Sequence, residues 1–193
     1  MLCITCVYTG QTDLNKKTEK IMTFENQIKQ HRKALFKKWF QATVETYPPE
    51  TAKVLGKSEN KFDNPVGVTT RESLEGVLDR LEKNELDELE LEKILDPVIR
   101  IRAIQSFSAS DAVGFIFMLK DIMEETIGEP ADRAFLRNVD RIALAGFNRF
   151  MKCREDIYLL KATEAKRRVY SAFERSGLVA ELKEEDLLGS DKS

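Results

Sequence analysis

The longest stretch of this chain without a strong helix breaker runs from Pro130 to Gly177, and it constrains the fold more than any other feature. A span of that length exceeds an ordinary globular helix. Its apolar residues keep an approximately heptad rhythm that drifts after Leu160; they are Phe135, Val139, Ile142, Gly146, Phe150, Cys153, Ile157 and Leu160, followed by Ala165, Val169 and Ala172. The pattern predicts a long C-terminal helix that packs in its own domain and then projects. The alternative is a helix that breaks near residues 153–155 and folds back.

The rest of the chain also favours helices over strands. Only 9 glycines and 5 prolines punctuate the 193 residues, and 33% of the residues are charged, which is typical of long helices with solvated faces. At this length one hydrophobic core is expected. We therefore predict an all-α protein with a single helical-bundle domain at residues 23–176. Residues 1–22 are expected to be a disordered tail or an upstream extension, and residues 177–193 an acidic flexible tail.

Local signals predict where the first helices begin and end. Thr23 is the expected N-cap of the first helix, which the prolines at residues 48–49 should stop. A structured loop is expected at residues 57–68. The next helix should begin at the capping box of residues 69–72.

Two further signals concern the middle of the chain. An Asp-Pro pair at residues 96–97 predicts the start of a new helix, with Val98, Ile101 and Ile104 facing the core. Gly114 lies in the most apolar helix of the chain, where a glycine is tolerable if another helix crosses it closely.

Charge and cysteine content limit the possible partners and the compartment. The net charge of −2 provides no positive field to attract phosphates, so nucleic acid is not an expected partner. Three cysteines suit a reducing cytoplasm. Cys3 and Cys6 form a C-x-x-C pair, but the sequence offers neither spaced zinc ligands nor the strand and helix of a redox motif around it. No apolar run approaches the roughly 18 residues that cross a bilayer, so we expect no membrane insertion.

Motifs for catalysis are lacking in the sequence. It contains no Gly-rich phosphate loop or nucleophile elbow, and its one histidine, His31, removes the usual general base from most catalytic triads. We expect no enzymatic activity, metal or cofactor. The place of His31 on the first helix favours a partly buried core histidine. Cys153 and Met151 are interpreted as packing residues rather than oxidant sensors.

Two groups of residues are candidates either for ligand binding or for anchoring the loop. They are Trp39, Tyr47, Pro48, Asn64, Pro65 and Gly67 near the loop, with Arg100 and Arg102 further along the chain. Asparagine before proline, followed by glycine, is what a tight turn needs, which favours anchoring. The two arginines should point outward or cap a neighbouring helix end, and binding of a ligand carboxylate is the alternative.

Five segments of the sequence resemble the RsbRD N-terminal domain family, which is related in role to the input domain of the RsbT co-antagonists. These segments are residues 39–48, 62–67, 100–107, 110–115 and 151–155, and the likeness covers roughly residues 22–175. The resemblance implies an all-helical sensory module that helps to regulate a stressosome and its switch kinase, and a globin-like arrangement of its helices is one option. Because related input domains resemble a globin, the alternative function is a sensor of haem or another small molecule, with His31 as the iron ligand. In full-length co-antagonists this module precedes a STAS domain, for which the chain leaves no room, so we expect a stand-alone regulator with a regulatory protein partner.

The apolar stripe of the C-terminal helix also predicts a homodimer. It continues beyond the length that one small domain can cover, and exposed stripes of that kind usually find a partner. The residues expected at the interface are Ile157, Leu160, Val169 and Phe173.

Overall fold

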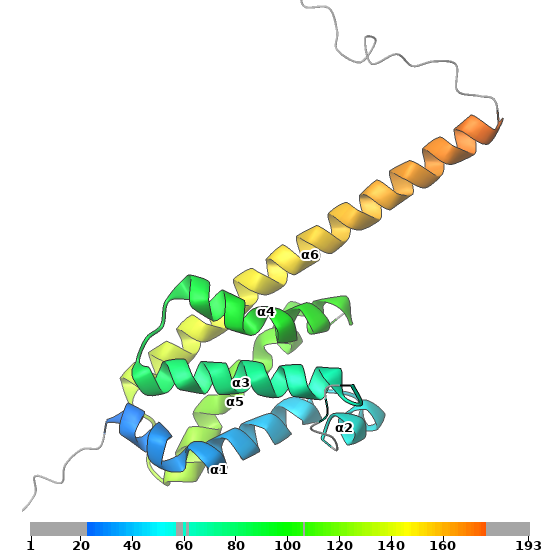
Figure 1. Cartoon of the computed structure of the whole chain (residues 1–193). Helices are drawn as coiled ribbons and strands as arrows, with labels where there is room; N and C mark the ends of the chain where they lie inside the picture. The colour runs from blue at the N-terminus through cyan, green and yellow to red at the C-terminus, as the bar shows by residue number, and fades with distance from the viewer. Residues whose placement is uncertain (1–22, 57–59, 61, 106, 177–193) are drawn as a thin grey trace, which may run out of the picture.

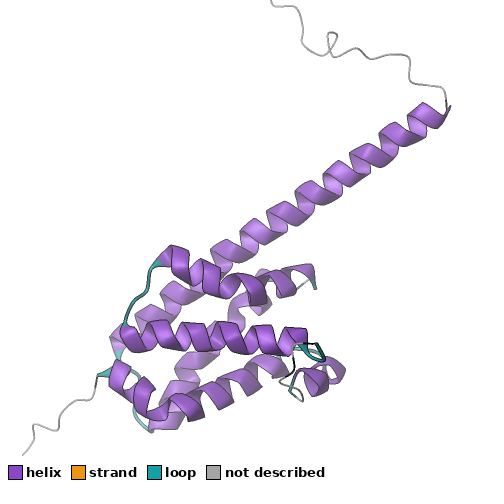
Figure 2. Cartoon of the chain, in the orientation of Figure 1, coloured by secondary structure: helices purple, strands orange, loops and turns teal. Residues whose placement is uncertain are grey.

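The computed structural model describes residues 23–56, 60, 62–105 and 107–176, and these form six helices and no strand (Figures 1 and 2). The helices are α1 (Phe24–Glu45), α2 (Pro49–Leu55), α3 (Pro65–Lys83), α4 (Glu88–Ile104), α5 (Ala109–Ile127) and α6 (Arg133–Ser176). The predicted all-α helical bundle with a long C-terminal helix is confirmed. The expectations for residues 1–22 and 177–193, including those for Cys3 and Cys6, lie outside the described residues.

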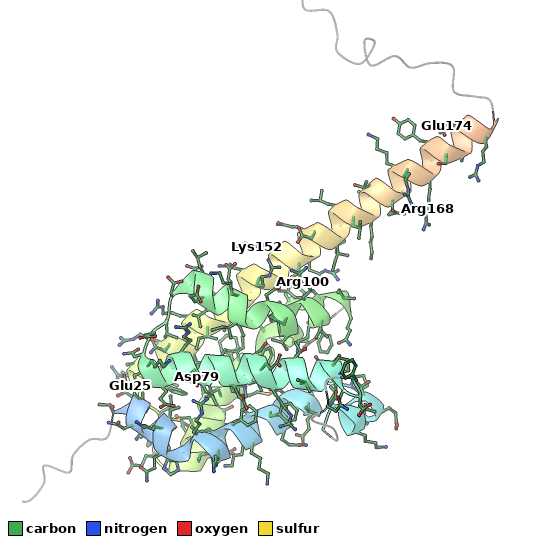
Figure 3. All side chains as sticks on the ribbon, viewed as in Figure 1. Glu25, Asp79, Arg100, Lys152, Arg168 and Glu174 are labelled. Atoms are coloured by element: carbon green, nitrogen blue, oxygen red, sulfur yellow. The ribbon has the colours of Figure 1, made fainter. Side chains whose placement is uncertain are left out.

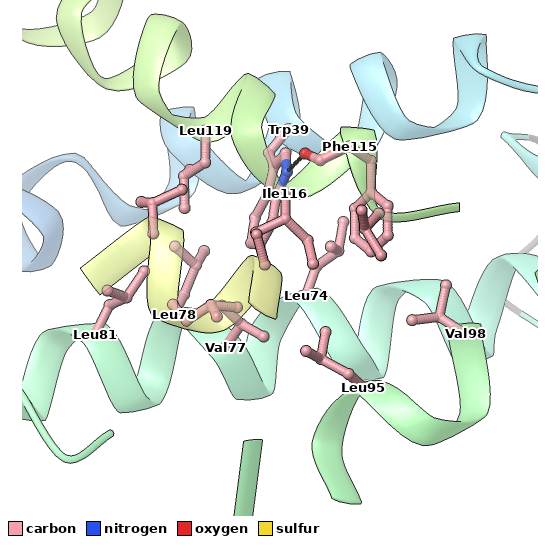
Figure 4. Packing of buried hydrophobic residues seen from close by; sticks show 14 of the residues in the cluster. Trp39, Leu74, Val77, Leu78, Leu81, Leu95, Val98, Phe115, Ile116 and Leu119 are labelled. Atoms are coloured by element: carbon pink, nitrogen blue, oxygen red, sulfur yellow. Dashed lines mark hydrogen bonds between the residues drawn. The ribbon is translucent and has the colours of Figure 1, made fainter. Parts of the chain in front are cut away.

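The core lies among α1, α3, α5 and the first part of α6, with α4 packed across α3 and α6. Apolar residues three or four positions apart give α1 one buried face, which carries Ile28, Leu35 and Trp39. Trp39 is fully buried, and its indole Nε1 donates a hydrogen bond of 2.7 Å to the backbone oxygen of Phe115 in α5 (Figure 4). This bond satisfies the indole N–H in the interior and fixes α1 against α5.

Helix α3 begins earlier than the capping box predicts. Asn64 is its N-cap, and the Asn64 side chain accepts a hydrogen bond from Gly67 N, while Pro65 occupies the first turn. Thr70 consequently lies inside the helix, where its hydroxyl donates to Val66 O. The prediction of a start at residues 69–72 is therefore wrong, because the asparagine and proline supply a complete helix start one turn upstream.

Helix α4 is also longer than predicted, because it runs through Pro97 without a restart. Its N-cap is Asp87, whose side chain accepts from Glu90 N. Leu95 and Val98 are fully buried on either side of the proline, and their packing holds the helix together where one backbone hydrogen bond is missing. Ile104 is 66% exposed, so its predicted inward orientation is wrong; Ala103 takes the buried position instead.

Helix α6 is continuous over 44 residues, so the predicted long helix is confirmed and the alternative of a break near residues 153–155 is wrong. At a rise of 1.5 Å per residue it is roughly 65 Å long. Its inner face is buried as far as Cys153, Ile157 is half-buried, and the remainder extends beyond the bundle (Figure 1). We call residues 158–176 the projecting segment. Among the described helices none is both long and apolar enough to cross a membrane.

Two glycines show where helices approach closely and where they do not. A Cβ on Gly146 would lie 3.0 Å from Ile116 Cδ1, so this glycine permits close packing of α6 on α5. A Cβ on Gly114 would meet nothing within 4 Å. No close helix crossing therefore accounts for Gly114 in the described part of the chain.

Candidate functional site

The junction of α2 and α3 is held by one buried side chain. Asn64 is 2% exposed, and its Nδ2 donates a hydrogen bond of 2.7 Å to Leu55 O at the end of α2. Its Oδ1 accepts one of 2.9 Å from Gly67 N. A Cβ on Gly67 would lie 2.2 Å from Asn64 Nδ2 and 2.6 Å from Leu55 O, so only glycine fits here without a shift. In this geometry Asn64, Pro65 and Gly67 fix the entry into α3.

Arg102 is fully buried and ties α4 to two other helices. Its guanidinium donates hydrogen bonds to Thr43 O (3.3 Å), Thr46 Oγ1 (2.8 Å) and Asp111 O (3.0 Å). Thr43 O belongs to the last turn of α1, where a cation is favoured by the helix dipole. Burial lowers the pKa of Arg102. Arg102 therefore caps the end of a neighbouring helix, whereas Arg100 points outward on the surface.

Three aromatic rings surround the same guanidinium. The Arg102 Cζ atom lies 4.8 Å from the ring centroid of Tyr47, 5.0 Å from that of Phe107 and 4.6 Å from that of Phe115. Burial raises the pKa of the Tyr47 hydroxyl. In the described part of the chain the guanidinium donates to two carbonyl oxygens and one hydroxyl, all of them uncharged. The aromatic rings therefore add to the stabilisation of this cation.

A hollow of about 370 Å³ opens beside this cluster, and we call it the α5 hollow. It is lined by Thr46, Phe107, Ser110, Asp111, Gly114, Phe115 and Met118. Trp39, Tyr47 and Arg100 do not line it; Arg100 instead forms an exposed ion pair of 3.1 Å with Asp96. Sequence reasoning missed the hollow, although Gly114 in a strongly apolar helix is the signal that could have indicated open space there.

Most of the exposed large apolar side chains of the described chain lie on α6, and several of them share its outer face. This face includes Leu144, Met151, Tyr158 and Val169, all more than 40% exposed. Next to it, α4 and α6 enclose a shallow hollow of about 540 Å³, the α4–α6 hollow, which is lined by Glu88, Leu89, Glu92, Asn148, Met151, Lys152 and Glu155. In Figure 3, Arg168 and Glu174 lie on the projecting segment, beyond all other helices.

The four predicted dimer residues do not share one face of α6. Ile157 is half-buried, and Leu160, Val169 and Phe173 are exposed. Since each residue of an α-helix turns the chain by about 100°, Leu160 and Val169 point in opposite directions. Phe173 lies on the side of Val169, whereas Ile157 and Leu160 continue the side that faces the core.

Comparison with known proteins identifies the family. Residues 33–165 match the family described as RsbT co-antagonist protein rsbRD N-terminal domain, which is more than half of the chain. The chain belongs to this family. No curated protein and no solved structure matches it significantly. The predicted resemblance is confirmed, and this RsbRD N-terminal domain is a regulatory input domain of the stressosome type.

The matched residues of the RsbRD N-terminal domain end within α6, eight residues into the projecting segment. They include the Asn64 junction, the Arg102 cluster and both hollows. The projecting segment therefore belongs in part to the region that the family shares.

Three further side chains of the RsbRD N-terminal domain bear on the alternatives considered from sequence. His31 is half-buried on α1 and lines neither hollow, and no cluster of three or more metal-ligating side chains occurs in the described residues. Cys153 is 2% exposed, and burial raises the pKa of its thiol. Met151, by contrast, is 41% exposed on the outer face of α6.

Proposed function

We propose that this RsbRD N-terminal domain is a non-enzymatic input module that acts through protein–protein contacts of α6 in a bacterial stress or metabolic regulatory system. The observation that carries the proposal is the exposure of apolar side chains along α6, where no helix of the same described chain covers them. Leu144, Tyr158 and Val169, which share the outer face of α6, are each more than half exposed to solvent. Apolar surface of this extent is typical of an interaction site.

A homodimer in the cytoplasm is the simplest assembly that covers this surface. One self-complementary patch suffices to form a closed dimer. The dimer also gives the domain a means of signalling, because a regulatory partner bound to the bundle could shift the packing of α6 and thereby the spacing of the projecting segments. The matched family supports the regulatory role. The continuity of α6 from the core to the projecting segment supports the transmission of such a shift along the helix.

Light scattering on the purified full chain tests the dimer. At tens of micromolar protein, the expected mass is twice the 22.2 kDa of one chain. A mass of one chain at that concentration would contradict the homodimer and leave a heterologous regulatory partner as the remaining form of the proposal.

The second candidate function is a small-molecule sensor, and the α5 hollow favours it. Arg102 does not line the hollow but donates hydrogen bonds to two residues that do, Thr46 and Asp111. The Nε of Arg102 has no hydrogen-bond partner in the described chain. A small carboxylate with an apolar part would suit a hollow with aromatic walls near a cation.

A thermal-shift titration with small carboxylic acids tests this candidate. The matched variant is Gly114→Leu, which fills the α5 hollow at a position where a Cβ meets nothing within 4 Å. Stabilisation of the natural chain that Gly114→Leu abolishes would support a ligand site. Equal responses of both proteins, or none at all, would contradict it.

A further inference from the structure

The guanidinium of Arg102 lies directly beneath the α5 hollow. Four of the seven residues that line the hollow contact this group. Thr46 Oγ1 and the backbone oxygen of Asp111 accept its hydrogen bonds at 2.8 and 3.0 Å, and the rings of Phe107 and Phe115 flank it. The residues that separate this fully buried cation from the open space are therefore its own contact partners.

The hydrogen-bond acceptors of this guanidinium in the described part of the chain carry no charge. Burial of a charge without a paired counter-charge is costly. Arg102 Nε and Tyr47 Oη are also buried and have no hydrogen-bond partner in the same described residues. The base of the α5 hollow therefore favours an anionic group.

Thr46 is the side chain through which an anion in the hollow would reach the guanidinium. Its hydroxyl accepts from Arg102 and donates a hydrogen bond of 2.7 Å to Thr43 O. Thr46 is the C-cap of α1 and is half-buried, so a rotation about its χ1 moves the hydroxyl without moving the helix. A carboxylate could then accept from Arg102 in place of Thr46.

The exposed edge of the same hollow carries a negative charge. The carboxylate of Asp111 is exposed, and its Oδ2 accepts a hydrogen bond of 2.6 Å from Ser108 Oγ. Burial lowers the pKa of Arg102, and the charge of Asp111 opposes this by a smaller amount. A ligand with only a carboxylate would pair with Arg102 but be repelled by Asp111, and a simple amine would meet the reverse problem.

The remaining walls of the α5 hollow are apolar. They are formed by Phe107, Phe115 and Met118, and a Cβ on Gly114 would meet nothing within 4 Å. The volume of about 370 Å³ lies in the range of small-molecule sites. An apolar side chain of a small ligand therefore has both room and matching walls.

We infer that the α5 hollow binds a zwitterionic α-amino acid with an apolar side chain. Its carboxylate pairs with Arg102, its ammonium group pairs with Asp111, and its side chain packs on Phe107 and Phe115. The inference rests on the small-molecule sensor proposed above and names its ligand class. In this arrangement each charge of the ligand faces the opposite charge of the protein, which gives specificity.

Titration calorimetry on the purified full chain tests this ligand class. The probes are L-phenylalanine, L-leucine and L-methionine. Each is compared with the acid that lacks only the ammonium group and with the amine that lacks only the carboxylate. We expect at least one amino acid to bind about tenfold more tightly than both of its analogues, because each analogue loses one charge-assisted contact. Gly114→Leu should abolish this binding, since it fills the hollow.

The outcomes separate the ligand class from the sensor itself. Acids that bind as tightly as their amino acids would overturn the role of Asp111 while keeping a carboxylate sensor. Amines that bind as tightly would overturn the role of Arg102. Equal binding to Gly114→Leu would place the ligand outside the α5 hollow and overturn the inference. No binding of any probe would overturn the inference and the sensor together.

Asp111→Asn provides an independent test, because asparagine can still accept the hydrogen bond from Ser108. This variant should bind the amino acid about tenfold more weakly and should no longer prefer it over the simple acid. Asp121→Asn is the matched control, since Asp121 is exposed on the same helix and does not line the hollow. Unchanged binding by Asp111→Asn, or an equal loss in Asp121→Asn, would contradict the proposed ammonium contact.

Discussion

Trp39 and Phe115 lie 76 residues apart in the sequence and are joined by a hydrogen bond of 2.7 Å between the indole Nε1 and the backbone oxygen. Their rings also stack, with centroids 6.3 Å apart. Both residues are fully buried, so the contact combines a satisfied polar group with apolar packing at the interface of α1 and α5.

Trp39→Ala should therefore lower the free energy of unfolding by about 3–5 kcal/mol, because it leaves a large cavity at this interface. Trp39→Phe keeps a ring but loses the hydrogen bond, and we expect a smaller loss of roughly 1–3 kcal/mol. Urea unfolding followed by circular dichroism measures both. Phe117→Ala is the control on α5, because Phe117 is 43% exposed. It should lower the free energy of unfolding by less than Trp39→Ala or Trp39→Phe. A near-neutral Trp39→Ala would contradict the assigned core.

Arg102→Lys should destabilise the bundle although it keeps the charge. Lysine has no planar fork with which to reach Thr43 O, Thr46 Oγ1 and Asp111 O together, so at least one buried acceptor would lose its donor. We expect a loss of roughly 2 kcal/mol. Arg100→Lys, at an exposed ion pair, should change stability by less than about 1 kcal/mol. Equal effects of the two substitutions in chemical denaturation would show that Arg102 does not join the helices.

Two glycine substitutions should change the stability of the fold in opposite directions. Gly67→Ala places a Cβ within 2.6 Å of Leu55 O and should destabilise by about 1–3 kcal/mol. Gly114→Ala meets open space inside α5 and should stabilise by up to about 1 kcal/mol, the difference in helix propensity. We expect a melting temperature below that of the natural chain for Gly67→Ala and above it for Gly114→Ala. Destabilisation by Gly114→Ala would mean that the α5 hollow is closed in solution.

The thiol of Cys153 should react slowly in the folded protein. It is buried, and burial raises its pKa, so little thiolate is present at pH 8 and reagents reach it poorly. In the Cys3→Ser, Cys6→Ser background, modification by a disulfide reagent should be at least about a hundredfold slower in buffer than in denaturant. Comparable rates would restore oxidant sensing as a possible role for this cysteine.

The periodic patterns of apolar residues predicted the helices that pack strongly. The predictions failed where a local helix-start signal conflicted with the packing of the folded chain. The α6 pattern identified a single long helix because an apolar residue recurs on its inner face up to Ile157. Pro97 was misinterpreted as a helix start, since sequence alone does not show that Leu95 and Val98 are buried on both sides of it. Two adjacent start signals, Asn64-Pro65 and the capping box, could not be ranked without the contact of Asn64 with Leu55 O.

The candidate site was less predictable than the fold. Arg102 was recognised as a possible helix cap, but its partners come from α1 and α5, so its burial depends on how three helices meet. The residues chosen for the dimer were selected for being apolar, which placed Leu160 and Val169 in one group although they lie on opposite faces. The approach of Glu88 and Glu92 of α4 to α6 could not be predicted either, because it exists only in the folded bundle.

The most direct test of the proposed α6 homodimer is a distance between spin labels on Glu174 of the two copies, measured by pulsed dipolar spectroscopy on Glu174→Cys in the Cys3→Ser, Cys6→Ser background. Glu174 is exposed near the end of α6. Two copies paired along α6 hold the labels at a fixed separation, so we expect one well-defined distance at tens of micromolar protein. The absence of dipolar coupling between copies at that concentration would contradict the homodimer.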